Sequence, residues 1–486
     1  MANTTIKKEK SRMKKAKKKV LIVYTGGTIG MLNTVENEPS SPLEPATWEA
    51  IKKHSPGFKS LPFDVEIEQM KPLIDSSDMS PKNWIDIAKL INKNYKSFDG
   101  FVVLHGTDTM SYTATALSFI FENLDKPVII TGSQLPLSKA RSDASQNLVT
   151  SLMIAASEGV PVIPEVCVYF NNVLLRGNRS RKVSSSGLDG FDTPNYSPLA
   201  TVGEHIEADP RLIREVPKDG FFINAHLETN VMMFDIFPGI SREIINHIFN
   251  IPDLQGVILR TYGTGNAPTD DALLNEIHTA ITEKNIAVVN ITQCNQGIVE
   301  MGLYSASVKL SRMGVISGVD MTPEAALVKM MYLIGQGYKT EDLKEQMQKD
   351  LRGEQRYNVF NLNYNAGETT EGVSRLDMKR VPGGFKREKI ARANIRFDGL
   401  QLVEGKEINL AVYMNYPSVD KTADINIPQC IGYLERVTAL TDCVINCTEG
   451  VKQVINPSQP VQIAVVSQNG NISWEGVVLS IFTDVE

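Results

Sequence analysis

Short apolar runs alternate with amphipathic stretches along the chain from Lys19 onward. Four runs are apolar at nearly every position, which is typical of strands buried on both faces of a sheet. Between the second and third run, Leu117, Ile120 and Leu124 recur at helical spacing and predict a helix over 111–124. A strand, crossover helix and strand of these lengths form a right-handed parallel unit, so this region is predicted to be α/β. The four predicted strands are 20–25, 101–105, 128–131 and 166–170.

The same alternation resumes after a charged, proline-containing stretch at 204–220. Apolar runs at 256–262 and 286–292 predict two further strands, and the amphipathic stretch 270–284 predicts a helix between them. Helices are expected from Pro323 to about Leu351. These elements predict a second, smaller α/β domain.

Beyond Arg356 the period changes to two, which indicates half-buried strands. The clearest segments are 407–414, 461–466 and 476–482, and Pro, Gly and Asn separate them. The pattern predicts a third, β-rich module. The expected division is a basic tail at 1–18, an N-terminal α/β domain at 19–205, a linker at 206–220, the smaller α/β domain at 221–356, a linker at 357–396 and the β-rich extension at 397–486. The last linker is predicted because the stretch 379–396 is basic and contains glycine.

Composition identifies an ordinary globular protein, with 42% hydrophobic and 22% charged residues among 486. No stretch approaches the roughly 18 to 20 apolar residues of a membrane helix, so no membrane partner is expected. The first nineteen residues hold nine basic side chains and one acid, and the formal charge of −6 leaves −14 on the rest. We expect the tail to be solvated and disordered. Because it has no aromatic residue to stack on bases, no nucleic-acid partner is expected.

The five cysteines are scattered and odd in number, which favours free thiols in a reducing compartment and predicts a cytoplasmic protein. The basic start is followed by too short an apolar run for a signal peptide. Cys443 and Cys447 stand four apart, but no nearby cysteine pair or histidine completes a zinc site. The six histidines form no ligand pattern either. We expect no metal and no organic cofactor.

Two polar turns follow predicted strands, at the edge of a parallel sheet where ligands bind. The first, TGGTIG at 25–30, lacks the glycine spacing of a dinucleotide fold and the Lys-Ser/Thr of a P-loop, so it is either a tight turn or part of a site. The second, HGTDTM at 105–110, contains Thr107, Asp108 and Thr109, which could simply cap the next helix. Together the turns would gather hydroxyls and a carboxylate above one sheet, as a nucleophile requires.

A third candidate is RGNRSRK at 176–182. Most of these cations are expected to lie on the solvated surface. A lysine folded over the sheet edge beside other cations would lose its proton more readily and could act as a base. The residues alone do not choose among Arg179, Arg181 and Lys182 as the cation that points inward.

Several longer motifs, in order, resemble the bacterial-type L-asparaginases, specifically their cytoplasmic type I group. The resemblance spans about residues 19–356 and implies a two-domain fold, with a larger N-terminal parallel-sheet domain and a smaller C-terminal α/β domain. The β-rich extension lies outside it. The motifs are TGGTIGM, PLIDSSDM (72–79), the continuous segment 98–137, RSDASQNL (141–148), FNNVLLRGNRSRK (170–182), LRTYGTGNAP (259–268) and NITQCNQG (290–297).

The resemblance implies an enzyme that hydrolyses L-asparagine to L-aspartate and ammonia. Thr28 matches the family nucleophile, which forms a β-aspartyl ester with the substrate. Thr107, Asp108 and Lys182 match the set that the family uses for proton transfer. A threonine hydroxyl is a weak nucleophile at neutral pH, so it needs such a base nearby.

The resemblance also implies how the substrate is held. Ser76 aligns with the serine that contacts the α-carboxylate, and Asp108 would pair with the α-ammonium group. Ser77 stands where many secreted relatives have glutamine. Asn266 matches an asparagine that reaches into the active site of a neighbouring subunit, which implies a homodimer or homotetramer.

Two features depart from the family pattern. Many relatives carry a tyrosine in the loop after TGGTI, whereas residues 31–50 contain none and Glu38 falls near that place. Some cytoplasmic relatives bind asparagine at a second site near the positions of Arg260, Arg181 and Cys294, and the bulky Arg181 argues against carrying this regulation over.

Two other functions compete with hydrolysis of asparagine. One is an amidotransferase subunit that releases ammonia from glutamine for a tRNA-bound substrate, although such subunits usually bear an N-terminal rather than a C-terminal β-barrel. The other is a scaffold on an inactive fold, in which the tail and the β-rich module carry the function. Retention of Thr28, Thr107, Asp108 and Lys182 favours an enzyme.

Overall fold

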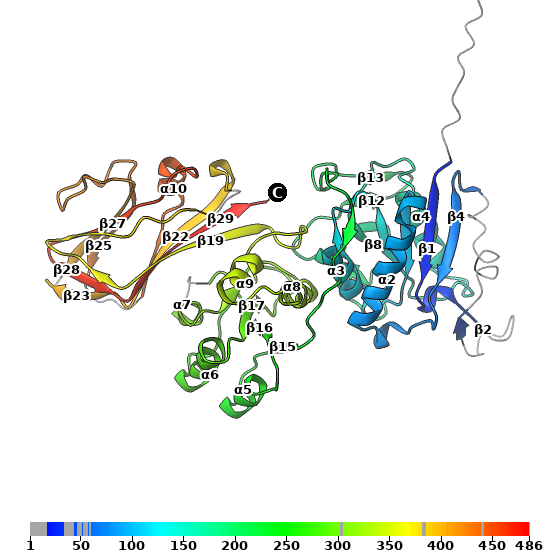
Figure 1. The fold of residues 1–486 in the computed structure, drawn as a ribbon, viewed down its shortest axis with the longest axis horizontal. Helices are drawn as coiled ribbons and strands as arrows, with labels where there is room; N and C mark the ends of the chain where they lie inside the picture. The colour runs from blue at the N-terminus through cyan, green and yellow to red at the C-terminus, as the bar shows by residue number, and fades with distance from the viewer. Residues whose placement is uncertain are drawn as a thin grey trace, which may run out of the picture.

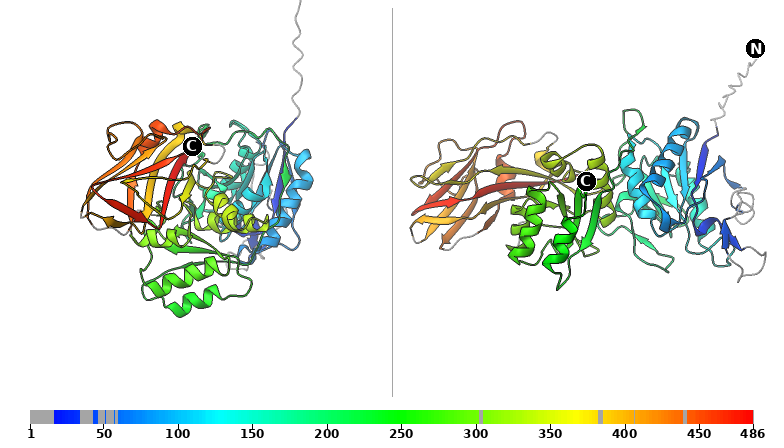
Figure 2. Two further views of the ribbon diagram at one scale, coloured as in Figure 1. Left: turned by 60° about the vertical axis from the view of Figure 1, so that its left-hand side comes forward. Right: turned by 60° about the horizontal axis from the view of Figure 1, so that its bottom comes forward.

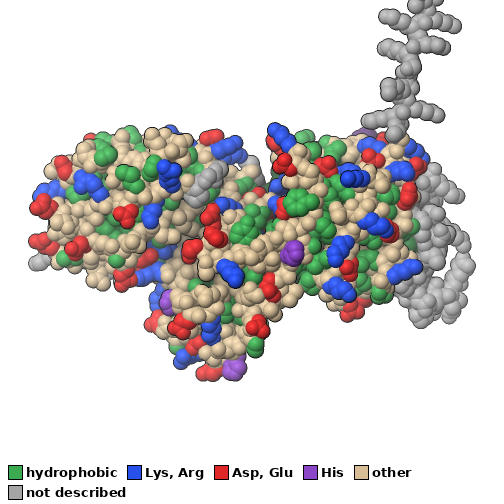
Figure 3. Space-filling model, in the orientation of Figure 1, with side chains coloured by type: hydrophobic (Ala, Val, Ile, Leu, Met, Phe, Trp, Pro, Cys, Tyr) green, Lys and Arg blue, Asp and Glu red, His purple; other side chains and the backbone are tan. Residues whose placement is uncertain are grey.

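The computed structural model describes residues 17–33, 43–45, 51, 57, 60–301, 305–381, 385–405, 407–438 and 442–485. The chain forms three lobes that succeed one another along the long axis in sequence order (Figure 1). Basic and acidic side chains are interspersed on the face shown in Figure 3. The predicted tail, up to residue 16, and Glu38 lie outside the described residues.

The first lobe is built on an eight-stranded sheet with the order β13-β12-β9-β8-β7-β5-β1-β4. Strands β4, β1, β5, β7 and β8 are parallel, and β9, β12 and β13 complete the sheet in antiparallel fashion. Leu21 and Val23 of β1 pack in one core with α2 and α3, whereas Val20 and Ile22 pack in another with α4. Helices therefore cover both faces, as a parallel sheet requires. The bounds are β1 Lys19–Tyr24, β4 Asp64–Gln69, β5 Gly100–Leu104, β7 Val128–Thr131, β8 Val166–Phe170, β9 Val173–Arg176, β12 Ala200–Val202, β13 Ile206–Ala208, α2 Pro81–Asn94, α3 Met110–Ile120 and α4 Ala144–Ala155.

Smaller elements surround this sheet. The helix predicted over 111–124 ends earlier than expected, because Phe121–Glu122 forms strand β6 and pairs with β14 about a hundred residues later. The start of the expected linker at 206–220 is also part of the large sheet, as β13. The remaining bounds are β2 Met31–Asn33, β3 Leu43–Pro45, β6 Phe121–Glu122, β10 Arg181–Lys182, β11 Phe191–Asp192, β14 Phe222–Ile223 and the 3-10 turns η1 Thr28–Gly30, η3 Ser76–Asp78, η4 Tyr95–Ser97 and η5 Gly177–Arg179.

The second lobe has a four-stranded parallel sheet in the order β15-β16-β17-β18. Helices α5, α6 and α7 contribute to the core on one face, while α8 packs on the other and belongs to the core that begins in the first lobe. There Phe119 of α3 stacks on Tyr332 of α8 with ring centroids 5.7 Å apart. The two α/β lobes thus share one apolar core. The bounds are β15 Val231–Asp235, β16 Gly256–Thr261, β17 Ala287–Thr292, β18 Ile316–Ser317, α5 Arg242–Phe249, α6 Asp271–Thr282, α7 Ser305–Arg312, α8 Pro323–Gly335 and α9 Thr340–Met347.

The third lobe is a β module of antiparallel sheets that enclose their own core (Figure 2). One sheet has the order β19-β29-β22-β26, a second has β21-β27-β24-β25, and a third has β20-β28-β23. The bounds are β19 Tyr357–Tyr364, β20 Gly367–Glu368, β21 Val373–Arg375, β22 Ile390–Asp398, β23 Gln401–Glu404, β24 Ile408–Met414, β25 Cys430–Val437, β26 Cys443–Asn446, β27 Ile463–Gln468, β28 Asn471–Trp474, β29 Gly476–Asp484, α10 Thr448–Val454 and η6 Arg387–Lys389.

The linker expected at 357–396 is wrong, because this stretch supplies strands to the core of the module. Strand β19 pairs with β29 along its whole length. The basic residues of β22 alternate with apolar ones, as Arg392 next to Ala393 shows. The side chains of Ala393, Ile395 and Phe397 are buried in the core. The charged side chains therefore lie on one face of a strand and do not indicate a solvent-exposed linker.

Candidate active site

Two glycine turns meet at the carboxyl edge of the large sheet, where β1 and β5 end side by side with Tyr24 opposite Leu104. Gly27 has a φ of +89°, and a Cβ atom there would lie 2.4 Å from the amide nitrogen of Gly106. Only glycine permits this conformation and this approach. Since Thr28 and Thr107 directly follow the two glycines, the contact brings the two threonine-bearing turns together.

A third segment, which carries Ser76, packs on the same turns. A Cβ atom on Gly26 would lie 2.2 Å from the carbonyl oxygen of Ile74, and one on Gly106 would lie 2.4 Å from Ser76 Oγ. Thr109 Oγ1 donates to the carbonyl oxygen of Ser76 at 2.6 Å, and Ser76 is only 4% exposed. The predicted substrate-binding serine is therefore held directly beside the turn of Thr107.

Ser77 is exposed and turns toward its own segment. Its backbone N–H and its hydroxyl both donate to Asp75 Oδ1 at 2.9 Å. These two hydrogen bonds, the backbone one first, hold the pKa of the Asp75 carboxyl below its usual range. Asp75 thereby caps the short turn η3 and orients Ser76.

The side chain of Lys182 extends onto the turn of Thr107. Lys182 Nζ lies 2.8 Å from Thr107 Oγ1 and 2.7 Å from Asp108 Oδ1. The lysine side chain is 19% exposed, whereas the Asp108 carboxylate is 63% exposed. Pairing of β10 with β11, with Lys182 opposite Phe191, holds the lysine in this place. A hydroxyl, a carboxylate and an amine thus share one hydrogen-bonded group at the sheet edge.

The sequence did not determine which cation of RGNRSRK points toward the threonine turns. In the structure each of these cations has a different carboxylate partner. Arg179 is buried and donates from Nη1 to Asp320 Oδ2 at 2.7 Å. Arg176 is buried as well, with Nε 2.6 Å from Glu165 Oε2. The expectation that most of these cations lie on the solvated surface is wrong for these two, because buried carboxylates of other segments pair with them. Only Lys182 reaches the threonine turns.

His105, which is not among the predicted site residues, is wholly buried at the end of β5. Its Nδ1 lies 2.6 Å from the carbonyl oxygen of Gly106, and its Nε2 lies 2.8 Å from Thr113 Oγ1. Burial lowers the pKa of His105 to about 4, so the ring is neutral at pH 7. The one sequence signal for His105 is its place directly before Gly106 in the HGTDTM turn. The ring orients the Gly106 peptide against which Gly27 packs.

Asn266 lies in the second lobe, in a tight turn after β16. Tyr262 N donates to Asn266 O at 2.9 Å and Asn266 N donates to Tyr262 O at 2.8 Å. Within the described residues, the buried side-chain oxygen of Asn266 has no hydrogen-bond partner. No hydrogen bond described for this chain joins it to Thr107, Asp108 or Lys182.

The residues considered for a second asparagine site lie near the boundary of the two α/β lobes. Arg181 Nη1 donates to Asn295 Oδ1 at 3.0 Å, and its Nε lies 3.7 Å from Glu324 Oε1. Arg260 Nη1 donates to Asp235 at 2.9 Å, and Cys294 is exposed. Burial raises the pKa of the Glu324 carboxyl. Arg181 thus has an acidic neighbour, Glu324, which the sequence did not indicate.

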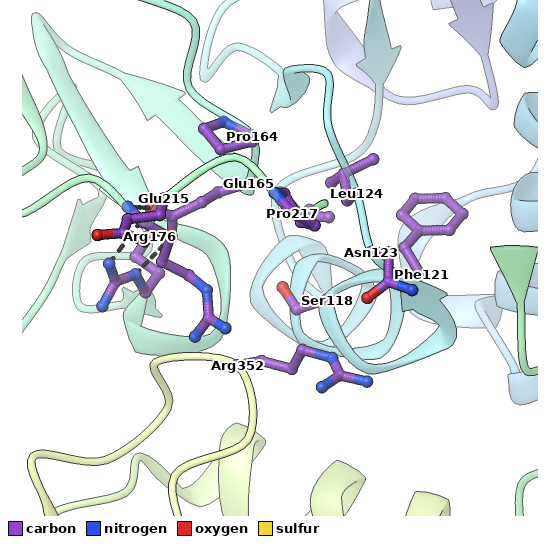
Figure 4. Close-up of a pocket in the computed structure, with 12 residues that line it drawn as sticks. Ser118, Phe121, Asn123, Leu124, Pro164, Glu165, Arg176, Glu215, Pro217 and Arg352 are labelled. Atoms are coloured by element: carbon purple, nitrogen blue, oxygen red, sulfur yellow. Dashed lines mark hydrogen bonds and ion pairs between the residues drawn. The ribbon is translucent and has the colours of Figure 1, made fainter. Parts of the chain in front are cut away.

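The cavity in Figure 4 lies at the opposite edge of the sheet. Its volume is about 100 Å³, and Val166, the first residue of β8, lines it together with Leu124 and Arg352. Ligands of parallel sheets bind at the carboxyl ends of strands, so this cavity is not the candidate site. Across the described ranges, no cluster of three or more His, Cys, Asp or Glu residues is placed to hold a metal ion.

The chain matches the family description "Asparaginase, N-terminal" over residues 19–214 and "Glutaminase/Asparaginase C-terminal domain" over residues 230–347. It is 43% identical over 343 residues to L-asparaginase 1 of Escherichia coli K12, covering 70% of this chain and 98% of that relative. This chain belongs to the asparaginase family. It is an amidohydrolase with the two-domain asparaginase fold, and a β-rich region follows that fold.

Two further relatives support the assignment to the asparaginase family. The solved L-asparaginase I of Vibrio cholerae is 44% identical, superposes with a TM-score of 0.64, and is matched over 99% of its chain and 70% of this one. The human 60 kDa lysophospholipase is 41% identical over 362 residues, which cover 69% of this chain and 61% of that protein. The β module lies beyond the residues that the family descriptions match.

No helix in the described part of the chain combines the length and the apolar character needed to cross a membrane.

Proposed function

We propose that the protein hydrolyses L-asparagine to L-aspartate and ammonia through a β-aspartyl ester on Thr28. The observation that supports this most directly is the placement of Lys182 within hydrogen-bonding distance of Thr107 and Asp108. That group stands beside the contact of Gly27 with Gly106, one residue away from Thr28. This arrangement supports the assignment of a nucleophile, a proton relay and a carboxylate to the ligand-binding edge of the sheet.

The chemistry begins with attack of Thr28 Oγ1 on the side-chain carboxamide carbon of the substrate. The hydroxyl proton passes through Thr107 and Lys182 to the amide nitrogen, the C–N bond breaks, and ammonia leaves. A water molecule then attacks the ester carbon, releases L-aspartate and returns the proton to Thr28. Backbone N–H groups of the two turns stabilise the oxyanion of each tetrahedral intermediate.

The substrate's α-groups are held beside this relay. The largely exposed carboxylate of Asp108 pairs with the α-ammonium while it keeps its contact with Lys182. Ser76, buried against Gly106, receives the α-carboxylate, and Ser77 adds a polar group next to it. Asn266 completes the site of a neighbouring subunit, so the working unit is a homodimer or homotetramer.

The proposed compartment is the cytoplasm. All five cysteines are free thiols. Burial raises the pKa of Cys443 to about 11 and that of Cys447 to about 12, so these thiols are protonated and unreactive at neutral pH. Free thiols of this kind suit a reducing environment.

The test is ammonia release from L-asparagine, L-glutamine and D-asparagine by the full chain. Thr28→Ala should lower kcat for L-asparagine by about 10⁴-fold or more, as removal of a nucleophile does elsewhere, while Thr28→Ser keeps a hydroxyl and retains part of the rate. Lys182→Arg keeps the charge but removes the base, and should also be strongly impaired. Near-normal turnover in Thr28→Ala would refute the nucleophile.

The glutamine arm addresses the amidotransferase alternative. L-Glutamine is longer than L-asparagine by one methylene, which changes the discrimination between two substrates by only about 1 to 3 kcal/mol. The preference between these two substrates must therefore be measured. Faster release from L-glutamine than from L-asparagine would favour the amidotransferase function. Absence of release from all three substrates would favour the scaffold.

A further inference from the structure

Two arginines of similar exposure anchor the β module to the second lobe, but they reach different segments. Arg312, at the end of α7, pairs with Asp442 at 3.0 Å and with Glu475. Arg392, in β22, pairs with Glu300 in the loop after β17. The apolar part of this boundary joins Val359 and Phe482 of the module to Val319 of the second lobe. The last strand, β29, returns to the same boundary (Figure 1).

Arg392 is held from two sides. Its guanidinium carbon lies 4.1 Å from the ring centroid of Phe482, and its Nη1 contacts Glu300 Oε1. Both partners of the ion pair are 23% exposed, so solvent screens this pair less than a fully exposed one. The module therefore fixes the side chain of Glu300 at a defined place.

The backbone of Glu300 in turn supports the turn of Asn266. Glu300 N donates to the carbonyl oxygen of Thr264 at 2.9 Å. Gly265 has a φ of +112°, and a Cβ atom there would lie 2.9 Å from Val299 Cγ1, so the turn rests on the segment 299–300. Asn290 Nδ2 also donates to the carbonyl oxygen of Gly265, at 3.2 Å. A short path of direct contacts thus runs from Arg392 to Asn266.

The segment 299–300 is also held by Val319, at the boundary between the second lobe and the β module. Val299 N donates to the carbonyl oxygen of Val319 at 2.8 Å. Val319 has a φ of +56°, which is an outlier for a β-branched residue and persists only where the surroundings impose it. Its side chain packs on Val359 and Phe482 of the module. The module therefore contributes to the conformation that receives Val299.

We propose that Arg392 is a positioning residue, through which the β module sets the turn 262–266 and hence the reach of Asn266 toward substrate. This inference rests on the proposed function, because only the proposed role of Asn266 connects the turn to catalysis. The module is then more than an appendage, since an arginine outside the asparaginase fold adjusts a substrate-binding residue through Glu300 of that fold.

The structural arm of the test is hydrogen–deuterium exchange of the peptide that covers residues 261–267, measured on the full chain. In Arg392→Ala, exchange in this peptide should accelerate by about fivefold, the lower end of couplings between linked sites. Arg312→Ala, the matched control, removes an arginine from the same boundary and should leave this peptide unchanged. Equal exchange in the two variants would overturn the positioning role. Glu300→Gln, which preserves size, replaces Arg392→Ala if that variant does not fold.

The kinetic arm separates positioning from loss of stability. In Arg392→Ala, KM for L-asparagine should rise by about fivefold with kcat within twofold, whereas Arg312→Ala should keep both values. In an Asn266→Ala background, Arg392→Ala should have no further effect on KM, because it acts through Asn266. Additive effects would overturn the inference.

The two arms also separate this inference from the proposed function. If the wild-type chain releases no ammonia from L-asparagine, the proposed function fails, while hydrogen exchange still decides whether Arg392 sets the turn.

Discussion

Gly27 and Gly106 lie backbone to backbone at the carboxyl edge of the large sheet, and neither has room for a side chain. A Cβ atom on Gly27 would lie 2.4 Å from the amide nitrogen of Gly106, and one on Gly106 would lie 2.4 Å from Ser76 Oγ. Three segments that are separate in the sequence are therefore brought together by the absence of Cβ atoms. The contact decides how far apart Thr28 and Thr107 can lie.

Gly27→Ala should nearly abolish activity in a folded protein. The new methyl group must push the two turns apart, and a misplacement of about 1 Å at a catalytic group can reduce the rate by about a hundredfold. The measurement is kcat/KM for L-asparagine together with the thermal unfolding midpoint. Gly159→Ala is the control, because Gly159 also has positive φ (+73°) but a Cβ atom there meets nothing within 4 Å. A small loss of stability with full activity is expected for that variant, and full activity in Gly27→Ala would contradict the prediction.

Burial of His105 predicts a loss of stability in mild acid. Its pKa falls from 6.5 to about 4 in the folded state, so the unfolded chain binds the proton first as pH falls through 6.5, and the free energy of unfolding decreases. The contribution lost between pH 7.5 and pH 5 is about 2 kcal/mol. Thermal unfolding across this range should therefore fall less steeply in His105→Gln than in the wild type. His278→Gln, at an exposed position, should follow the wild-type slope.

Lys329 and Glu354 form an ion pair in which both side chains are 0% exposed, with a separation of 2.6 Å. Lys329→Met leaves the Glu354 carboxylate buried without its cation, which should cost about 3 to 5 kcal/mol of stability. The double variant Lys329→Met with Glu354→Gln should recover much of that loss, because no uncompensated charge remains. Denaturant unfolding checks both variants.

The control for the buried pair is Lys309→Met, which breaks the exposed pair with Asp271. Such exposed pairs contribute about 0 to 1 kcal/mol, so little change is expected. An equal loss in Lys309→Met and Lys329→Met would show that burial does not set the size of the effect.

Much of the fold could be predicted from the period of the apolar positions. The strands expected at 20–25, 101–105 and 128–131 occur within one residue of those bounds, because strands buried on both faces must be apolar throughout. The pattern failed where pairing came from far along the chain. Residues 121–122 form a strand with β14 instead of extending the predicted helix. Strand β22 lies in the stretch predicted as a linker, because its charged face is more conspicuous in the sequence than its buried one.

The site could be assembled only in part before the structure was known. The sequence by itself determined which residue types stand at the strand ends, since the TGGT and HGTD turns follow strands that local patterns reveal. Tertiary structure decided which cation faces the threonines. Arg179 is drawn to Asp320 and Arg176 to Glu165, whereas Lys182 reaches Thr107 and Asp108. It also decided that Arg392 of the β module pairs with Glu300, whose backbone N–H donates to Thr264 in the turn of Asn266. Each of these pairs joins residues that are not neighbours in the sequence, and the pair of Arg179 with Asp320 also depends on how the two α/β lobes pack. No local periodicity encodes that packing.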